Sequence, residues 1–391
     1  MHKNSIHSDT HHYPPLLERR PTYAEVDLRA FRHNFQIVGE LLPGVKVIAI
    51  VKADAYGHGL LPIAHYLEQF KADYLGVGFL EEGVALREDK VNLPILVLGG
   101  VAGFQIDHFL EYDLDLTASS HFILGEIDRR ARRMNRQAKV HLKIDTGMNR
   151  IGVNYRRGMQ FLEAAAKLPG IQAKSIYSHL ASAEYDPDFT ETQCRRLNEF
   201  RLSAEKIFRC KIPFHILNTA GIINHPHWAM DAVRPGLMLY GLNPDFSYLP
   251  KSRLQPVLSL KSEIVFIKRV QASEGISYGL THTTSQETTI VTIPIGYGDG
   301  YPVRLSNKGQ VLIKGKRFPI IGKVCMDQIM VDVGDERVRI GEEVTLIGKQ
   351  DDDCITIEEI CRLTNAIPYE IACGITSRVP RLFIGGDKFN S

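Results

Sequence analysis

Eight short apolar runs alternate with amphipathic segments between residues 45 and 241, and this repeat restricts the fold more than any other feature. The runs are rich in β-branched residues and lie at residues 45–53, 73–78, 94–100, 115–119, 140–147, 174–181, 214–220 and 232–241. Between them, apolar residues recur every three or four positions, which is typical of helices that pack one face on a sheet. Eight such strand–helix units predict an α/β fold, a TIM-type (β/α)8 barrel.

A second, mostly-β domain is predicted after the barrel. Residues 256–335 hold short β-type runs, glycine-containing turns and no long helical pattern. We therefore expect a barrel over 22–255 and a β domain over 256–391 that includes a helix at 356–365. The strand at about 22–27 precedes the first barrel strand and can pair with the β domain instead. The polar residues 1–21 are expected to form a disordered tail.

Composition excludes several classes of partner. Lys and Arg total 47 against 45 Asp and Glu, and a net charge of +2 gives no strong field for nucleic acid or an anionic membrane. No apolar run approaches the roughly 20 residues of a membrane span, and the N-terminus has no signal peptide. The six cysteines are scattered without CxxC spacing, which argues against a disulfide framework and a zinc cluster. We expect a reduced, cytoplasmic protein without a metal.

The ends of the predicted strands carry the candidate chemistry, because barrels of this type build their active sites at the C-terminal ends of the strands. Strand one ends in Lys52, Lys143 and Arg150 belong to strand five and its loop, strand six contributes His179, and strand eight contributes Arg234. An amine desolvated in an apolar strand has a lowered pKa and suits Schiff-base chemistry. From position alone, a lysine that extends into solvent fits Lys52 equally well.

The opposite side of the predicted barrel mouth resembles a phosphate site. Asn218, Thr219 and the stretch 234–236 offer a hydroxyl, backbone N–H groups and a small residue, as TIM-barrel phosphate sites do. A lysine facing a phosphate site indicates pyridoxal phosphate as the cofactor.

The same positions resemble the bacterial alanine racemases, which are pyridoxal-phosphate enzymes of fold type III. The matching strings are VKADAYGHG (51–59), KIDTGMNRIG (143–152), YSHLASAE (177–184), VRPGLMLYG (233–241), SYG (277–279), IPIGYGDGYP (293–302), VCMDQIMVDVG (324–334) and PYEIACGITSRVPR (368–381). The resemblance spans roughly residues 22–382, and an ordered series of motifs is far more specific than one short motif. It implies interconversion of L-alanine and D-alanine, which supplies D-alanine for peptidoglycan.

The resemblance implies two bases on opposite faces of the substrate. Lys52 would hold pyridoxal phosphate as a Schiff base and serve one face of the substrate Cα, and Tyr278 would serve the other. The counterparts of His179 and Arg234 favour the phenolate form of the tyrosine. Arg234 would also face the pyridine nitrogen. Because a guanidinium keeps its proton, that nitrogen stays unprotonated, which favours racemisation over transamination.

The family's remaining ligands also have counterparts. Those near the phosphate are Tyr56, Asn218, Thr219, Gly236, Leu237 and Tyr369. Thr219 replaces the commoner serine and keeps its hydroxyl. Arg150 and the backbone of Met326 match the contacts to the substrate carboxylate.

Lys143 and the dimer arrangement complete the implied site. Lys143 matches a lysine that many members carbamylate, and Asn149 stands where glycine is frequent. The family forms a head-to-tail homodimer with two shared active sites. Its partner subunit supplies the counterparts of Tyr278, Tyr297, Arg304, Met326 and Asp327, of which Tyr297, Arg304 and Asp327 belong to an entry channel.

Other functions stay open at this stage. A racemase of the same fold with serine or a broader range of amino acids as substrate has the same motifs. A barrel-fold pyridoxal-phosphate decarboxylase shares the cofactor lysine and lacks the context of Tyr278. A cofactor-homeostasis protein is a barrel alone, and a cofactor-free Schiff-base aldolase leaves Arg234 and Tyr278 unexplained.

Overall fold

The computed structural model describes residues 20–243 and 253–386, and it divides into two compact units. The barrel unit comprises Val26–Leu258, Ala366–Gly374 and the chain from Phe383 onward. Within the described residues, the β unit comprises 20–25, Ser259–Asn365 and Ile375–Leu382. Residues 1–19 of the predicted tail lie outside the described residues.

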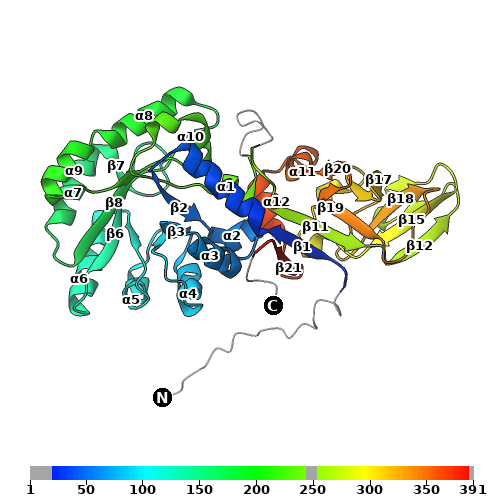
Figure 1. Cartoon of the computed structure of the whole chain (residues 1–391), viewed down its shortest axis with the longest axis horizontal. Coiled ribbons are helices and arrows are strands. Elements are labelled where there is room, and N and C mark those ends of the chain that lie inside the picture. The colour runs from blue at the N-terminus through cyan, green and yellow to red at the C-terminus, as the bar shows by residue number, and fades with distance from the viewer. Residues whose placement is uncertain (1–19, 244–252, 387–391) are drawn as a thin grey trace, which may run out of the picture. The chain divides into compact units, whose positions relative to one another are not determined.

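Eight parallel strands form the barrel unit's sheet in the order β4-β3-β2-β10-β9-β8-β6-β5, and a parallel bridge between Leu96 and Asp115 joins the two ends (Figure 1). The predicted (β/α)8 barrel is therefore confirmed. The strands are β2 (Lys46–Ile50), β3 (Tyr74–Val77), β4 (Ile95–Val97), β5 (Leu116–Ala118), β6 (Ala138–Asp145), β8 (Ile171–Tyr177), β9 (Phe214–His215) and β10 (Ala232–Val233); β7 (Val153–Asn154) pairs with β6.

Helices alternate with these strands, and their ends are capped where the sequence supplies a capping side chain. Asp27 caps α1 by accepting from the backbone N–H groups of Arg29 and Ala30, and Ser120 caps α6 in the same way. The helices are α1 (Leu28–Leu41), α2 (Lys52–Gly57), α3 (Leu60–Gln69), α4 (Leu80–Glu88), α5 (Ile106–Glu111), α6 (His121–Arg133), α7 (Gly158–Ala166), α8 (Pro187–Asn198), α9 (Arg201–Phe208) and α10 (Thr219–Asn224), with 3₁₀ turns η2 (Gly103–Gln105), η3 (Tyr155–Arg157), η4 (Pro226–Trp228) and η5 (Leu237–Tyr240).

Two predicted strands are shorter than the sequence pattern indicates. The run 214–220 is extended only at β9, because Asn218 caps α10 by accepting from the N–H of Gly221. The run 232–241 is extended only at β10 and continues into η5. In both runs the chain therefore leaves the strand at the C-terminal end of the barrel, where Thr219 and Arg234 lie.

The β unit contains a ten-stranded sheet with the order β12-β15-β18-β17-β16-β19-β11-β1-β21, and β20 pairs with β19. Strand β1 thus lies in this sheet and not in the barrel. The strands are β1 (Tyr23–Asp27), β11 (Leu258–Glu263), β12 (Phe266–Val270), β15 (Thr288–Ile293), β16 (Gln310–Ile313), β17 (Lys316–Ile321), β18 (Ile329–Gly334), β19 (Glu343–Gln350), β20 (Asp353–Ile355) and β21 (Arg381–Ile384), with a separate hairpin of β13 (Gly275–Ile276) and β14 (His282–Thr283).

Short helices complete the β unit. They are α11 (Ile357–Thr364) and the 3₁₀ turns η6 (Tyr278–Leu280), η7 (Tyr297–Asp299) and η8 (Val303–Leu305). The helix predicted at 356–365 corresponds to α11, which Thr356 caps through the N–H of Glu359. Helix α12 (Pro368–Gly374) groups with the barrel unit, although it follows most of the β unit in the sequence. No helix in the described ranges is long and apolar enough to cross a membrane.

Candidate active site

A cavity of about 230 Å³ opens at the C-terminal ends of the barrel strands and collects most of the predicted site residues. It is lined by Ile50, Lys52, Tyr56, Leu98, Lys143, Arg150, Ile151, Tyr177, His179, Asn218, Thr219, Arg234, Gly236 and Tyr369. Residues from six strand ends and from α12 therefore converge on one space. Leu237 directly follows the cavity-lining Gly236 and is fully buried.

The chain leaves β2 in a left-handed turn that carries Lys52 and Tyr56. Four consecutive non-glycine residues, 53–56, have φ between 52° and 54°. A non-glycine residue in this conformation costs about 1–2 kcal/mol. Hydrogen bonds hold the turn: the Ala53 N–H donates to Glu82 Oε1 (2.5 Å) and Asp54 Oδ1 accepts from the Leu60 N–H (2.7 Å). Strain of this size concentrates at functional sites.

Glycine at position 57 is required by a close approach within this turn. Gly57 has φ of 78°, and a Cβ there would lie 2.2 Å from the carbonyl oxygen of Ala372 in α12. The glycine therefore lets α12 pack on the turn and brings Tyr369 to Tyr56, with 5.6 Å between ring centroids.

The sequence pattern places Lys52 inside the first barrel strand. In the structure β2 ends at Ile50, so Lys52 lies two residues beyond the strand. Its side chain keeps contact with solvent at the cavity mouth. Partial desolvation and then the charge of Arg150 lower the pKa of its amine, and Glu82 opposes this shift. The local environment therefore favours the neutral, nucleophilic form more than free lysine does.

Backbone and hydroxyl groups form a narrow recess on the opposite side of the cavity. Thr219 Oγ1 accepts from the Gly236 N–H at 3.0 Å. A Cβ at position 236 would lie 2.6 Å from the Tyr56 hydroxyl oxygen, so only glycine leaves this space open. Asn218 lies alongside and is engaged as the cap of α10.

Arg234 is 3% exposed and is held from several sides. Its Nη2 donates to the carbonyl oxygens of Ser178 (2.7 Å) and Ile216 (2.9 Å) and to His179 Nδ1 (3.3 Å), and its Nη1 donates to His215 Nδ1. Burial lowers the pKa of the guanidinium to about 10, so it stays charged at neutral pH. Burial and the surrounding cations hold the pKa of His179 well below its ordinary value, which keeps this imidazole neutral.

Lys143 is an unusual buried amine. It is 5% exposed, and its Nζ lies 4.1 Å from the centroid of the Tyr177 ring. Burial, followed by the charges of Arg234 and Arg150, holds the pKa of Lys143 well below its usual range. Two neighbouring cations therefore favour a neutral amine here.

The loop that leads to Arg150 is fixed by one carboxylate. Asp145 Oδ1 accepts from the N–H groups of Gly147 and Met148 at 2.9 Å and of Asn149 at 3.2 Å. Asn149 has φ of 54°, a left-handed conformation that asparagine tolerates better than most residues. Asparagine is therefore compatible with the backbone conformation of this loop.

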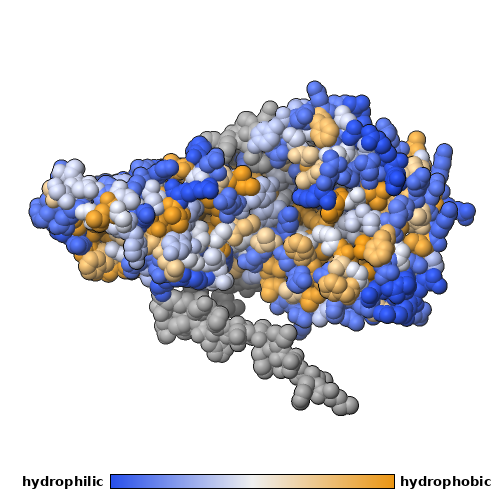
Figure 2. Space-filling view, turned by 180° about the vertical axis from the view of Figure 1, so that it is seen from behind, coloured by the Kyte–Doolittle hydropathy of each residue, from blue (hydrophilic) through white to orange (hydrophobic). Residues whose placement is uncertain are grey.

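The predicted residues of the β unit are all at its surface. The exposed fractions are 75% for Tyr278, 51% for Met326 and 45% for Tyr297, and Arg304 and Asp327 are exposed too. Figure 2 shows apolar residues in patches between hydrophilic areas of the surface. These side chains are therefore exposed to solvent, whereas most of the candidate residues of the barrel are enclosed by neighbouring side chains.

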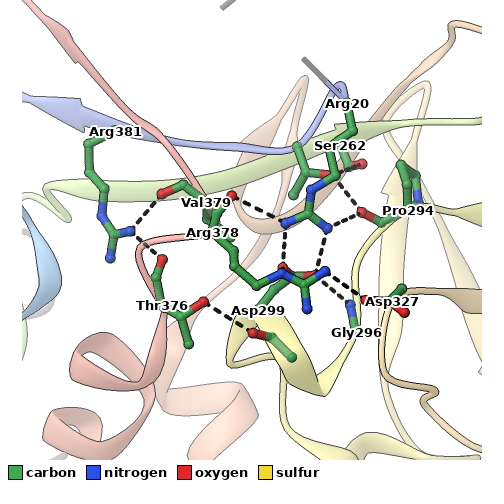
Figure 3. A network of polar contacts seen from close by, with 12 residues as sticks. Arg20, Ser262, Pro294, Gly296, Asp299, Asp327, Thr376, Arg378, Val379 and Arg381 are labelled. Carbon is green, nitrogen blue, oxygen red and sulfur yellow. Dashed lines mark hydrogen bonds and ion pairs between the residues drawn. The ribbon is translucent and has the colours of Figure 1, made fainter. Parts of the chain in front are cut away.

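A buried carboxylate organises the loops that carry three of these residues (Figure 3). Asp299, at the end of η7, is fully buried and pairs with Arg20 and Arg378. Its Oδ2 accepts from the Gly296 N–H at 3.0 Å, directly before Tyr297. The other loop is held by a backbone bond from Gly298 N–H to the Met326 carbonyl (2.9 Å) and by the pair of Arg378 with Asp327 (2.6 Å).

Sequence reasoning missed the polar residues inside the barrel. His141, Ser175 and His215 are 3%, 3% and 1% exposed, respectively. A signal was present for one of them: His141, Lys143 and Asp145 alternate along β6 and therefore face the same side of the sheet. No group of three or more potential metal ligands occurs in the described part of the chain.

Comparisons with known proteins agree along nearly the whole chain. The family models of the alanine racemase N-terminal and C-terminal domains match residues 26–244 and 257–383. An alanine racemase of Halothermothrix orenii is 44% identical over 374 residues, which cover 94% of this chain and 98% of that protein.

Solved structures give the same result. An alanine racemase of Clostridium difficile 630 has a TM-score of 0.87 at 36% identity and covers 94% of this chain and 96% of its own. An alanine racemase of Bacillus anthracis with bound L-Ala-P has a TM-score of 0.86 at 35% identity and covers 96% of this chain and 97% of its own. The chain therefore belongs to the alanine racemase family.

Proposed function

We propose that this protein interconverts L-alanine and D-alanine with pyridoxal phosphate bound in the barrel cavity. The observation that carries the proposal is the single cavity that joins Lys52, Arg234 and the Thr219–Gly236 recess. When bound, pyridoxal phosphate withdraws electrons from the substrate Cα, so that the Cα proton becomes acidic enough to be removed. The protein would cover the two faces of that carbon and exclude water.

The recess fits a phosphate group. Its donors are the Thr219 hydroxyl, the Tyr56 and Tyr369 hydroxyls and the backbone around Gly236 and Leu237. The supporting observation is that the Tyr56 hydroxyl and the backbone of Gly236 approach each other so closely that a Cβ at position 236 would collide with the hydroxyl. Asn218 would hold the recess in shape as the cap of α10.

Lys52 would hold the cofactor through Nζ and move a proton at one face of the substrate Cα. Its lowered pKa favours the neutral amine that both roles need. Arg234 would face the pyridine nitrogen and donate a hydrogen bond to it. A guanidinium with a pKa of about 10 keeps its proton at neutral pH, so it would leave the nitrogen unprotonated.

Arg150 and the Met326 backbone would hold the substrate carboxylate. We also propose that Lys143 reacts with CO₂ to form a carbamate. The amine nitrogen would bond to the carbon of CO₂ and release one proton, which converts a neutral group between Arg150 and Arg234 into an anion. The depressed pKa of Lys143 favours the nucleophilic form that this reaction needs.

Tyr278 would serve the opposite face of the Cα from the second subunit of a homodimer. Its 75% exposure fits a side chain that is covered only on association. Tyr297, Arg304, Met326 and Asp327 would enter the same shared site, with Tyr297, Arg304 and Asp327 along the substrate channel. Two-fold symmetry would give two equal sites. The D-alanine formed would enter peptidoglycan synthesis in the cytoplasm.

Three assays on purified protein test the proposal. We expect an absorption band at about 420 nm that borohydride removes, loss of optical rotation from L-alanine, and a mass of two chains in solution. Parallel assays with L-serine separate an alanine racemase from one of broader range, and CO₂ release would indicate a decarboxylase. A band without turnover of any amino acid would favour a homeostasis protein, and no band in excess cofactor would refute the proposed chemistry.

A further inference from the structure

Arg234 is a buried cation, and no negatively charged side chain of the described residues contacts its guanidinium. In the described residues, its guanidinium donates to carbonyl oxygens and imidazole nitrogens and touches no carboxylate. An isolated charge with 3% exposure is strongly unfavourable unless an opposite charge or an oriented chain of dipoles compensates it.

A chain of hydrogen bonds leads from Arg234 across the barrel interior to Asp115. Arg234 contacts His215 Nδ1 on β9, and His215 Nε2 lies 2.9 Å from Ser175 Oγ on β8. Ser175 Oγ lies 2.6 Å from His141 Nδ1 on β6, and His141 Nε2 lies 3.0 Å from Asp115 Oδ2. All five residues are at most 3% exposed.

The donor at one end fixes the proton of His215, and a neutral His141 then fixes the rest of the chain. A guanidinium can only donate, so His215 Nδ1 must accept and His215 Nε2 must carry the hydrogen. Ser175 Oγ then accepts from His215, and with a neutral His141 its O–H donates to His141 Nδ1. His141 Nε2 therefore carries the hydrogen that Asp115 accepts. The Tyr74 hydroxyl also donates to Asp115 Oδ2 at 2.8 Å, as expected for a carboxylate oxygen.

We propose that His215, Ser175 and His141 form a one-directional hydrogen-bond chain that connects Arg234 to the negative charge of Asp115 and fixes the guanidinium in position. These are positioning residues, because they act through Arg234 and do not line the Lys52 side of the cavity. Aligned hydrogen bonds polarise one another in a low-dielectric interior, so the carboxylate stabilises the guanidinium at a distance. The functional part of this inference rests on the role proposed for Arg234 in racemisation.

Neutron diffraction of the cofactor-free protein exchanged into D₂O tests the chain directly. We expect deuterium on His215 Nε2, on Ser175 Oγ pointing to His141, and on His141 Nε2. Deuterium on Nδ1 of either histidine would overturn the proposed direction. This measurement needs no turnover. If the protein racemises no alanine but the deuterium atoms lie as expected, the proposed function fails and the hydrogen-bond chain stands.

Two substitutions test the effect on Arg234. Ser175→Ala interrupts the chain, and Asp115→Asn keeps an accepting oxygen while it removes the charge. We expect kcat for alanine to fall roughly tenfold in each variant, with KM changed less than about twofold because Arg150 is untouched. Ser175→Thr restores the hydroxyl and should recover kcat.

The control is Ser262→Ala, which removes an equally buried hydroxyl that bonds Thr22 in the β unit. It should lower thermal stability comparably and leave kcat near that of the parent protein. If Ser175→Ala and Asp115→Asn match this control in kcat, the chain does not act on Arg234 and the functional part of the proposal is wrong. Asp115→Asn is isosteric, so the test remains decisive even if Ser175→Ala folds poorly.

Discussion

The barrel and the β unit contribute their candidate site residues in opposite ways. Lys143 and Arg234 are at most 5% exposed, and burial together with neighbouring cations already shifts the pKa of Lys143. Tyr278, Tyr297 and Met326 are at least 45% exposed. Folding therefore sets the chemistry of the barrel residues, whereas the β-unit residues depend on whatever covers them later.

The loops that carry the candidate residues differ between the two units as well. In the barrel, the backbone at 53–56 is held in a strained left-handed turn by Glu82 and Asp54. In the β unit, Asp299 is buried and ordered by two arginines, and the side chains that its loops carry point to solvent. The β unit thus provides an ordered support for side chains that stay exposed in the single chain.

The largest expected effect comes from the barrel side. Lys52→Ala removes the amine that would hold the cofactor and move the proton, so we expect turnover of alanine to fall by at least roughly 10⁴-fold. The band at about 420 nm should also disappear. Lys46→Ala is the control, because Lys46 is exposed at the start of β2, the strand that precedes Lys52. It should leave the turnover and the absorption band unchanged. Normal racemisation by Lys52→Ala would remove the central claim.

A change on the β-unit side should separate activity from stability. Tyr278→Phe removes only an exposed hydroxyl, so we expect its unfolding free energy to stay within about 0.5 kcal/mol of the parent protein. Cofactor binding should persist, and turnover should fall by roughly 10²–10⁴-fold because one proton-transfer group is lost.

Tyr185→Phe is the matched control for this change, since Tyr185 is 77% exposed and lies on the barrel unit. It should change neither stability nor turnover. Unaltered racemisation by Tyr278→Phe would mean that the second proton-transfer group is another residue.

The barrel could be predicted from sequence because eight repeats with strand and helix periodicity leave few alternatives. The left-handed turn after β2 could not, because Ala53 and Ala55 carry no signal for positive φ and the Ala53 N–H is bonded by Glu82, which is distant in the sequence. The placement of α12 with the barrel depends on contact between Gly57 and Ala372, which are 315 positions apart.

The candidate site also contains some residues that the sequence predicted and others that it did not. Lys52, Arg150 and Thr219 were found because motifs place them at strand ends. His215 and Ser175 were missed because neither lies at the C-terminal end of its run, and their role follows only from the direction of the Arg234 contact. His215 on β9 and Ser175 on β8 lie on neighbouring strands, and this becomes visible only when the sheet is formed.

A smaller effect concerns the pH dependence of the unfolding free energy. It tests whether burial lowers the pKa of Lys143. Its folded-state pKa is depressed, so between that value and the unfolded value of about 10.5 the unfolded chain binds one proton more. The unfolding free energy should rise with pH across this window, by at most about 1.4 kcal/mol per pH unit. Lys143→Met should lose this slope and gain stability at neutral pH.

The measurement is urea unfolding from about pH 7 to about pH 9.5 in CO₂-free buffer, because a carbamate would remove the titrating amine. The difference between the two curves isolates Lys143, since other groups contribute equally to both proteins. Parallel curves would show that this lysine titrates normally. Bicarbonate added to the parent protein should flatten its slope toward that of Lys143→Met if the carbamate forms.

The smallest expected effect probes the loop before Arg150, where the barrel site depends on backbone conformation. Asn149 has φ of 54°, so Asn149→Ala places a Cβ in a left-handed residue and should destabilise the protein by about 1 kcal/mol. Asn149→Gly should be within about 0.5 kcal/mol of the parent, because glycine adopts this conformation freely and loses more entropy on folding. Because glycine keeps the left-handed conformation and the bond from the N–H of residue 149 to Asp145 without strain, KM for alanine should rise less in the glycine variant than in the alanine variant. Equal stability and equal KM in both variants would show that the loop relaxes and that Arg150 is held by other contacts.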